Sequence, residues 1–245
     1  SNEGPAISIT DVNNDSLEDL FISGAKRQAS VLYVQQADGS FVSQDEAHFA
    51  DDALHEDTGH RFLDVDADGW QDLLVVSGGN EFTSGNPIRP RLYRNREGTF
   101  QKDTTAFEGI YINASSLDAV DMDQDGDPDL LICADAEAGA FGKNPTHALF
   151  ENDGQGHFRE VTREWIPELQ DFGGISDFVW ADLNGDGLQD LVAAGHWTPV
   201  AVFLNTGKGW QLSRNNGLED TNGWWNCLEV ADIDRSGDLD LVGGN

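Results

Sequence analysis

Basic residues are scarce in this sequence. Lys and Arg number 14 against 45 Asp and Glu, which gives the 245-residue chain a formal net charge of −31. So acidic a surface repels nucleic acid and anionic membranes, and we expect neither as a partner. No stretch approaches the roughly 20 apolar residues that a membrane-spanning helix needs. The first residues show no basic region followed by an apolar run, so no signal peptide is visible.

Cysteine is equally scarce, with only Cys133 and Cys227 in the chain. Both lie in short apolar runs far apart in the sequence, so we expect buried free thiols rather than a disulfide framework or a zinc site. The six histidines show no spacing typical of metal ligands. A Ser-His-Asp order, a nucleophile elbow and a phosphate-binding loop are also missing. We therefore predict no catalytic residues, no organic cofactor and no enzymatic activity.

The acidic residues are concentrated in a nine-residue segment that occurs five times. The copies begin at Asp11, Asp64, Asp121, Asp182 and Asp232, so successive starts lie 53, 57, 61 and 50 residues apart. They hold 20 of the 45 acidic residues, and carboxylates packed so closely repel one another unless a cation neutralises them. A repeat of this length is typical of one four-stranded propeller blade.

Short runs rich in Val, Leu, Ile and Phe surround each acidic segment and are too short for helices. Each complete repeat reads as strand, acidic loop, strand, longer loop, strand, tight turn and strand. The sequence thus predicts an all-β fold, a single β-propeller region of four-stranded antiparallel blades with about four and a half blades present. The predicted blades span residues 1–50, 51–106, 107–165, 166–216 and 217–245, the last of them incomplete.

Each acidic segment follows the pattern D-x-[DN]-x-D-G-x-x-D, which suits a calcium ion with its about six to eight oxygen ligands. Positions 1, 3 and 5 supply side-chain oxygens, position 7 a backbone carbonyl, and the Asp at position 9 closes the site. Position 6 favours glycine because the sharp turn needs positive φ. The candidate ligands are Asp11, Asn13, Asp15, Leu17, Asp19, Asp64, Asp66, Asp68, Trp70, Asp72, Asp121, Asp123, Asp125, Asp127, Asp129, Asp182, Asn184, Asp186, Leu188, Asp190, Asp232, Asp234, Ser236, Asp238 and Asp240.

The main alternative, an EF-hand, begins with the same residues but needs Glu at its twelfth position and flanking helices. The twelfth residues here are Ile22, Val75, Ile132, Ala193 and Gly243, and none can ligate through its side chain. The glycine-rich nonapeptide of calcium-binding β-helices is absent. Magnesium is disfavoured because it keeps its waters and rarely uses an all-protein cage. The sequence therefore predicts up to five calcium ions.

Two loops depart from the ideal pattern. The first has Ser16 where glycine is preferred, which predicts a strained turn. The fifth has Ser236 at position 5 and Arg235 beside it, so it loses a carboxylate and gains a positive charge. We expect the weakest site there, partly empty. Because protein ligands surround the metal in each loop, with at most one water, we expect a structural role rather than a catalytic one.

These loops, each followed by an Asp-Leu-hydrophobic-Gly strand, resemble the FG-GAP or VCBS repeat family, known from integrin α-subunit propellers and bacterial surface proteins. Residues 72–79 (DLLVVSGG) and 190–195 (DLVAAG) carry the resemblance, and residues 149–158 (LFENDGQGHF) are similar to the bacterial branch. It covers essentially the whole chain. It implies about seven blades when complete, an extracytoplasmic location, and a role in adhesion or ligand binding. We therefore expect the sequence to be part of a larger propeller.

The longer loops, on the face opposite the acidic loops, carry aromatic residues that could stack on a sugar or anchor a protein partner. Packing between blades is the simpler interpretation of the same residues. Trp224 and Trp225 are adjacent, so we expect at least one of them to be exposed. The aromatic residues of this face are Phe82, Phe141, Trp165, Phe172, Trp197, Trp224 and Trp225.

Three functions remain open for such a chain. The first is a calcium-stabilised module that binds a protein or a carbohydrate. The second is a polysaccharide lyase or hydrolase on the same scaffold, and the third is a structural spacer. A deep central pocket lined by Arg, Lys, His or Tyr would favour the enzyme, whereas a shallow aromatic face would favour binding.

Overall fold

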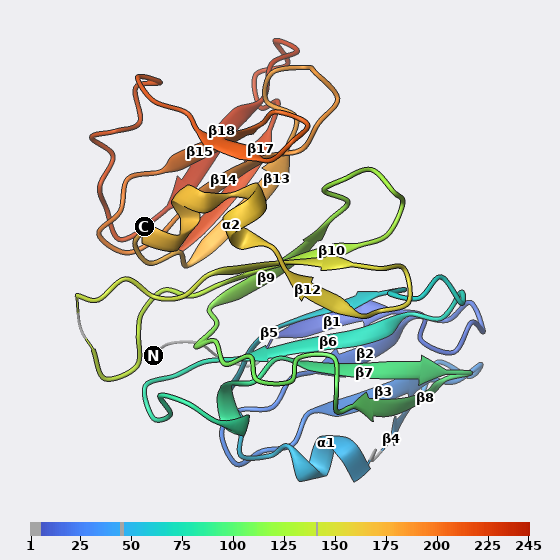
Figure 1. Ribbon diagram of the computed structural model, residues 1–245. Helices are drawn as coiled ribbons and strands as arrows, with labels where there is room; N and C mark the ends of the chain where they lie inside the picture. Colours follow the sequence, from blue (N-terminus) through green and yellow to red (C-terminus); the bar gives the residue numbers. More distant parts are fainter. Residues whose placement is uncertain (1–5, 45–46, 141) are drawn as a thin grey trace.

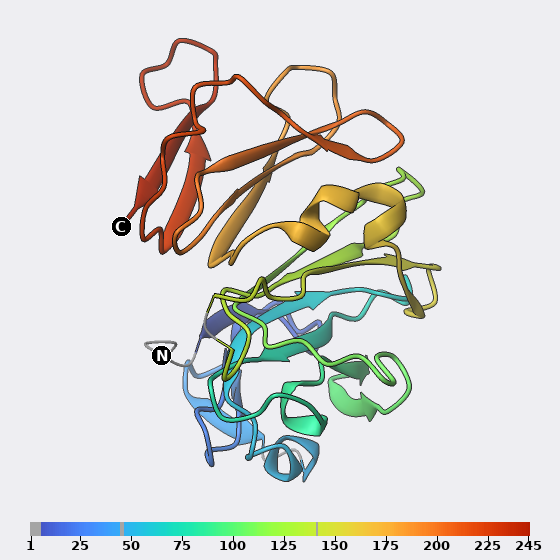
Figure 2. The ribbon, with the colours of Figure 1, turned by 60° about the vertical axis from the view of Figure 1, so that its left-hand side comes forward.

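The computed structural model describes residues 6–44, 47–140 and 142–245, which form small antiparallel sheets (Figure 1). Four sheets have four strands each, hydrogen-bonded in chain order, and a fifth has two. The predicted all-β architecture of four-stranded blades followed by a half blade is confirmed. In Figure 2 the first three blades occupy the lower part of the molecule, and the fourth blade and the half blade the upper part.

The strands follow the chain as five groups. The first two blades contain β1 (Ile7–Thr10), β2 (Asp19–Ile22), β3 (Val31–Gln35) and β4 (Phe41–Gln44), then β5 (Asp57–Leu63), β6 (Asp72–Ser77), β7 (Arg91–Arg96) and β8 (Thr99–Asp103). The next two contain β9 (Ser116–Val120), β10 (Asp129–Cys133), β11 (Ala148–Asn152) and β12 (Phe158–Glu160), then β13 (Asp177–Ala181), β14 (Asp190–Ala194), β15 (Ala201–Asn205) and β16 (Trp210–Leu212). The half blade contains β17 (Cys227–Ala231) and β18 (Asp240–Gly244).

Helices in the described residues are short and lie in connections. They are α1 (Ala47–Asp51), η1 (Asn86–Ile88), α2 (Thr162–Trp165) and η2 (Pro167–Asp171). Proline suits the start of η2 because the first helical turn needs no N–H donor there. No helix in the described part of the chain is both long enough and apolar enough to cross a membrane.

All five acidic loops join the first strand of a blade to the second in one register. The residue just before the loop pairs with the last aspartate of the loop, so each loop closes a β-hairpin. The pairs are Thr10 with Asp19, Leu63 with Asp72, Val120 with Asp129, Ala181 with Asp190, and Ala231 with Asp240. The first strands of neighbouring blades contact one another, so they form the centre of the assembly.

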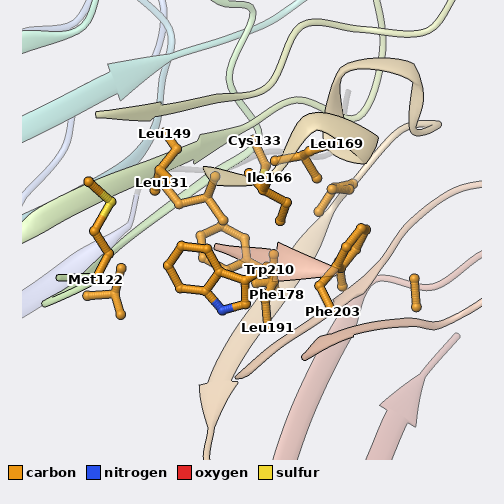
Figure 3. Packing of buried hydrophobic residues seen from close by; sticks show 14 of the residues in the cluster. Met122, Leu131, Cys133, Leu149, Ile166, Leu169, Phe178, Leu191, Phe203 and Trp210 are labelled. Atoms are coloured by element: carbon orange, nitrogen blue, oxygen red, sulfur yellow. The ribbon is translucent and has the colours of Figure 1, made fainter. Parts of the chain in front are cut away.

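The core lies between blades rather than within one blade. The second strands β6, β10 and β14 are buried along their whole length, because a neighbouring blade covers each face of the sheet. Figure 3 shows one such layer, in which Leu131 and Leu149 of the third blade face Leu191, Phe203 and Trp210 of the fourth. Similar layers join the first blade to the second, the second to the third, and the fourth to the half blade.

The two cysteines differ in their surroundings. Cys133 is fully buried between the third and fourth blades, and its thiol is free, as predicted. Cys227 is also a free thiol, but it is exposed on β17, so the prediction of burial is wrong for this residue. The reason lies in the half blade, where Leu228 packs on the fourth blade while alternate residues of β17 face outward.

Candidate metal-binding loops and the opposite face

The five acidic loops share one hydrogen-bonded conformation. In every loop the side chain at position 1 accepts a hydrogen bond from the backbone N–H at position 6, over 2.8–3.2 Å. The side chain at position 5 accepts a bond from the N–H at position 7, through a carboxylate in four loops and through the Ser236 hydroxyl in the fifth. These bonds hold the side chains at positions 1 and 5 against the turn.

Position 6 has positive φ in all five loops, as the glycine pattern predicts. The four glycines there have φ between 86° and 97°, and Ser16 has φ of 68°. A non-glycine residue in this region is strained by about 1–2 kcal/mol, so the first loop carries the strain expected from its sequence. Position 4 is also left-handed in every loop, which the sequence did not reveal, because only the fourth loop has glycine there. These residues are Asn14, Ala67, Gln124, Gly185 and Arg235.

The aspartate at position 9 is the most buried of the candidate ligands in each of the first four loops. One of its oxygens accepts a hydrogen bond from the N–H at position 2. The other accepts one from the last residue of the third strand or, in the second blade, from the penultimate residue Asn95. Burial raises the pKa of Asp72 to about 6 and that of Asp129 to about 7. A buried carboxylate next to other carboxylates lacks a countercharge, and a bound divalent cation would supply one.

Three loops bring carboxylate oxygens from positions 1, 3 and 9 within 4.8 Å of one another. They are the second loop with Asp64, Asp66 and Asp72, the third with Asp121, Asp123 and Asp129, and the fifth with Asp232, Asp234 and Asp240. The first and fourth loops have an amide, Asn13 or Asn184, at position 3 and so have carboxylates at only two of these three positions. The donor set is all oxygen, which fits calcium better than a transition metal.

The second loop has cationic neighbours that the sequence did not predict. Arg94 and Arg96 extend from β7, and their guanidinium groups lie 3.1 and 2.9 Å from the same Asp66 oxygen. Arg96 also pairs with Asp68. The other Asp66 oxygen is buried and has no hydrogen-bond partner. Two arginines therefore neutralise part of the charge that a calcium ion would meet in this loop.

Asparagines at the ends of the third strands β7 and β11 link the first two acidic loops to the following blades. The Asn152 amide donates to the Val65 carbonyl in the second acidic loop, over 2.9 Å, and Asn95 donates likewise to Val12 in the first, over 2.8 Å. The side-chain oxygen of Asn152 accepts a bond from Gly156 in the tight turn. These asparagines are buried and tie one blade to the loop of the preceding blade. Sequence reasoning placed them at strand ends but gave them no role.

The aromatic residues predicted for the opposite face divide into two groups. Trp165 and Phe172 pack on the core between the third and fourth blades, and Trp225 packs on the layer around Leu228. Trp197 and Trp224 remain 68% and 46% exposed, so the expectation that one of the adjacent tryptophans is exposed is confirmed. Phe82 is half-buried and lines a small hollow. Phe141 lies outside the described residues.

Comparisons with known proteins agree with this architecture. No curated protein matches the chain. Among solved structures, it is similar to an Agrocybe aegerita lectin described as specifically recognising non-reducing terminal N-acetylglucosamine. That likeness has a TM-score of 0.62 at 20% sequence identity, and it covers 99% of this chain and 60% of the lectin chain. The chain thus spans about three fifths of the length of that lectin, and at this identity the likeness shows the fold alone.

A family model described as an FG-GAP-like repeat matches the chain four times. The matches cover residues 11–75, 64–132, 140–193 and 182–243, so together they span most of the sequence. Every match contains at least one acidic loop together with the strand that follows it. The chain belongs to the FG-GAP-like repeat family.

Proposed function

We propose that the chain is a calcium-stabilised propeller module that binds a ligand outside the cytoplasm. Calcium binding is supported by one observation. Five loops of oxygen donors share a single hydrogen-bonded conformation. Calcium bound there would neutralise the clustered carboxylates and hold the two strands of each hairpin together. Its role is structural, because the loop residues surround the ion and supply no acid or base for catalysis.

Removal of calcium tests the metal half. We expect EDTA to lower the melting temperature of the purified chain, and calcium to restore it at concentrations at which magnesium does not. Asp125→Ala removes the central carboxylate of the third loop and should reduce the calcium stoichiometry, measured by isothermal titration calorimetry, by one ion. Asp38→Ala, an exposed aspartate in a turn of the first blade, is the matched control. Full stoichiometry in Asp125→Ala would show that the ligands are assigned wrongly.

The ligand half of the proposal is a carbohydrate. The fold is shared with a lectin, and exposed tryptophans gather on the face opposite the acidic loops. Within the described residues, the cavity on that face is lined by one histidine and by no Lys, Arg or Tyr. That lining lacks the Lys, Arg and Tyr residues expected of an enzyme pocket, which supports binding rather than catalysis. A protein partner is the alternative occupant of the same face.

A glycan-binding screen in the presence of calcium tests the ligand half. We expect retention of the chain on at least one immobilised neutral glycan, with N-acetylglucosamine-terminated glycans included because of the lectin likeness. Loss of retention after EDTA would show that carbohydrate binding depends on calcium, since loops without calcium would no longer hold the blades in alignment. If the chain is retained on no glycan while calcium still stabilises it, the proposal of carbohydrate binding is wrong and the proposal of calcium binding is kept.

A further inference from the structure

A large cavity lies at the centre of the face opposite the acidic loops. Its volume is about 1220 Å³, above the roughly 300–1000 Å³ typical of small-molecule sites. The walls come from the ends of second strands and the starts of first strands, and include residues such as Gly79, Asp135, Ser176 and Trp224 from the last four sheets. No single blade forms this cavity, so only their assembly creates it.

The cavity contains an aromatic surface built from two loops. The imidazole of His196 stacks on Trp224, with ring centroids 4.0 Å apart and planes inclined by 19°. Trp197 meets the same indole edge to face, at 5.3 Å and 87°. Trp197 is 68% exposed although tryptophan usually gains much from burial. The exposed ring offers a flat apolar surface in the wall of the cavity.

The backbone holds Trp197 in a conformation that bulky residues rarely adopt. Its φ is 68°, in the left-handed region that costs a non-glycine residue about 1–2 kcal/mol. Hydrogen bonds fix it there: its N–H donates to Gly223 over 2.8 Å, and its carbonyl accepts from Asn222 over 2.9 Å. Strain maintained on an exposed aromatic residue is typical of a residue held for contact with a ligand.

Polar groups of the cavity wall surround this surface. Asp135 and Asn226 lie 3.6 and 3.4 Å from the two ring nitrogens of His196. The side-chain oxygen of Asn113 is buried and has no hydrogen-bond partner, although its amide nitrogen donates to Ala136. The described lining includes Asp135 and Glu137 but no lysine or arginine. The wall therefore offers hydrogen-bond acceptors and disfavours anions.

We propose that this cavity binds a neutral oligosaccharide, with the apolar face of one sugar ring on the Trp197 indole. A pyranose presents C–H groups on its faces and hydroxyl donors around its rim, which matches an exposed indole in a cavity whose wall carries acceptors such as Asp135 and Glu137. The carboxylates of the wall disfavour a uronic acid or a sulfated sugar. This assignment rests on the proposed carbohydrate-binding function and adds the site and the ligand class.

The test uses the calcium-loaded chain and trisaccharides of glucose, galactose, mannose and N-acetylglucosamine, with a galacturonic acid trisaccharide as the anionic comparison. Isothermal titration calorimetry measures affinity, and tryptophan fluorescence reports contact with the indoles. We expect at least one neutral trisaccharide to bind at least about tenfold more tightly than the anionic one. Trp197→Ala should weaken that binding by about tenfold or more, the usual effect of truncating an aromatic anchor.

Phe41→Ala is the matched control, because Phe41 is 48% exposed on β4 of the first blade and does not line the cavity. Asp135→Ala is a second variant, expected to weaken binding without changing the melting temperature. If a trisaccharide binds and both cavity variants bind it as well as Phe41→Ala does, the site assignment is overturned while the carbohydrate function stands. If no neutral trisaccharide binds, both the site and the carbohydrate function are overturned.

Discussion

At the scale of single residues, the loops are alike in backbone and different in charge. The fifth loop keeps the shared hydrogen bonds because the Ser236 hydroxyl replaces a carboxylate as acceptor. The second loop has a complete set of carboxylates, but Arg94 and Arg96 already contact Asp66. Sequence alone placed the weakest calcium site in the fifth loop. The structure adds a reason for weaker binding in the second.

Removing one of these arginines should raise calcium affinity. In Arg96→Ala, Asp66 and Asp68 lose a guanidinium that competes with calcium for their oxygens. Because Arg96 is half exposed, we expect a gain of about threefold in the affinity of one site, or about 0.7 kcal/mol. Calorimetric titration with calcium measures it. Arg61→Ala, which removes a similarly exposed arginine paired with Asp118, should leave every site unchanged. Equal calcium affinities in Arg96→Ala and Arg61→Ala would show that Arg96 does not compete with calcium.

At the scale of the element, the third strand does more than extend the sheet. A residue at its end donates its backbone N–H to the position-9 aspartate of its own blade, as Asn152 does to Asp129 over 2.8 Å. The Asn152 side chain then reaches Val65 in the preceding blade. The acidic hairpin of one blade is thereby connected to the tight turn of the next. A calcium ion in one loop would therefore stabilise two blades.

Asn152→Ala should therefore destabilise the chain more than Asn205→Ala. Asn152 is 2% exposed, and its loss leaves the Val65 carbonyl and the Gly156 N–H without their partner, at about 1–3 kcal/mol each. Asn205 occupies the same place in the fourth blade, but its side-chain bonds to Gln189 and Gly207 stay within that blade and are only partly buried. Urea unfolding of both variants measures the difference. Equal losses of unfolding free energy in the two variants would show that the bond between blades adds nothing to stability.

At the scale of the whole molecule, layers between blades bury titratable groups as well as apolar ones. His60 lies between the first two blades, in edge-to-face contact with Phe21 at 4.8 Å, and neither ring nitrogen has a hydrogen-bond partner. Burial lowers the pKa of His60 to about 4, and it lowers the pKa of His147 to about 4 as well. Both imidazoles are therefore neutral in the folded chain at neutral pH.

This burial predicts loss of stability in acid. The unfolded chain binds protons at these histidines below about pH 6.5, whereas the folded chain binds them only near pH 4. Stability is therefore lost as pH falls through that window, by up to about 3 kcal/mol for each histidine. In His60→Phe that contribution disappears, so urea unfolding between pH 7 and pH 4.5 should show a shallower decline than in the wild type. Parallel losses of stability in His60→Phe and the wild type would show that His60 does not contribute to the acid sensitivity.

The sequence by itself determined the repeat, the strand order and the chemistry of the loops. These are local properties: a nine-residue pattern fixes its own turn, and short apolar runs fix the strands on either side. Even the strain at Ser16 follows from one position in the pattern. The sequence did not predict the left-handed backbone at position 4, because this position is not glycine in four of the loops. The residues there are Asn14, Ala67, Gln124 and Arg235.

Only the tertiary structure decided what lies between blades. The contact of Asn152 with Val65 joins two blades across 87 positions, and that of Arg96 with Asp66 joins two parts of one blade across 30 positions. No local pattern encodes either contact. The tryptophans were visible in the sequence, but which aromatic residues are packed and which are exposed depended on how neighbouring blades meet. Burial is a property of the assembled layers, because a side chain loses contact with water only when a neighbouring sheet covers it.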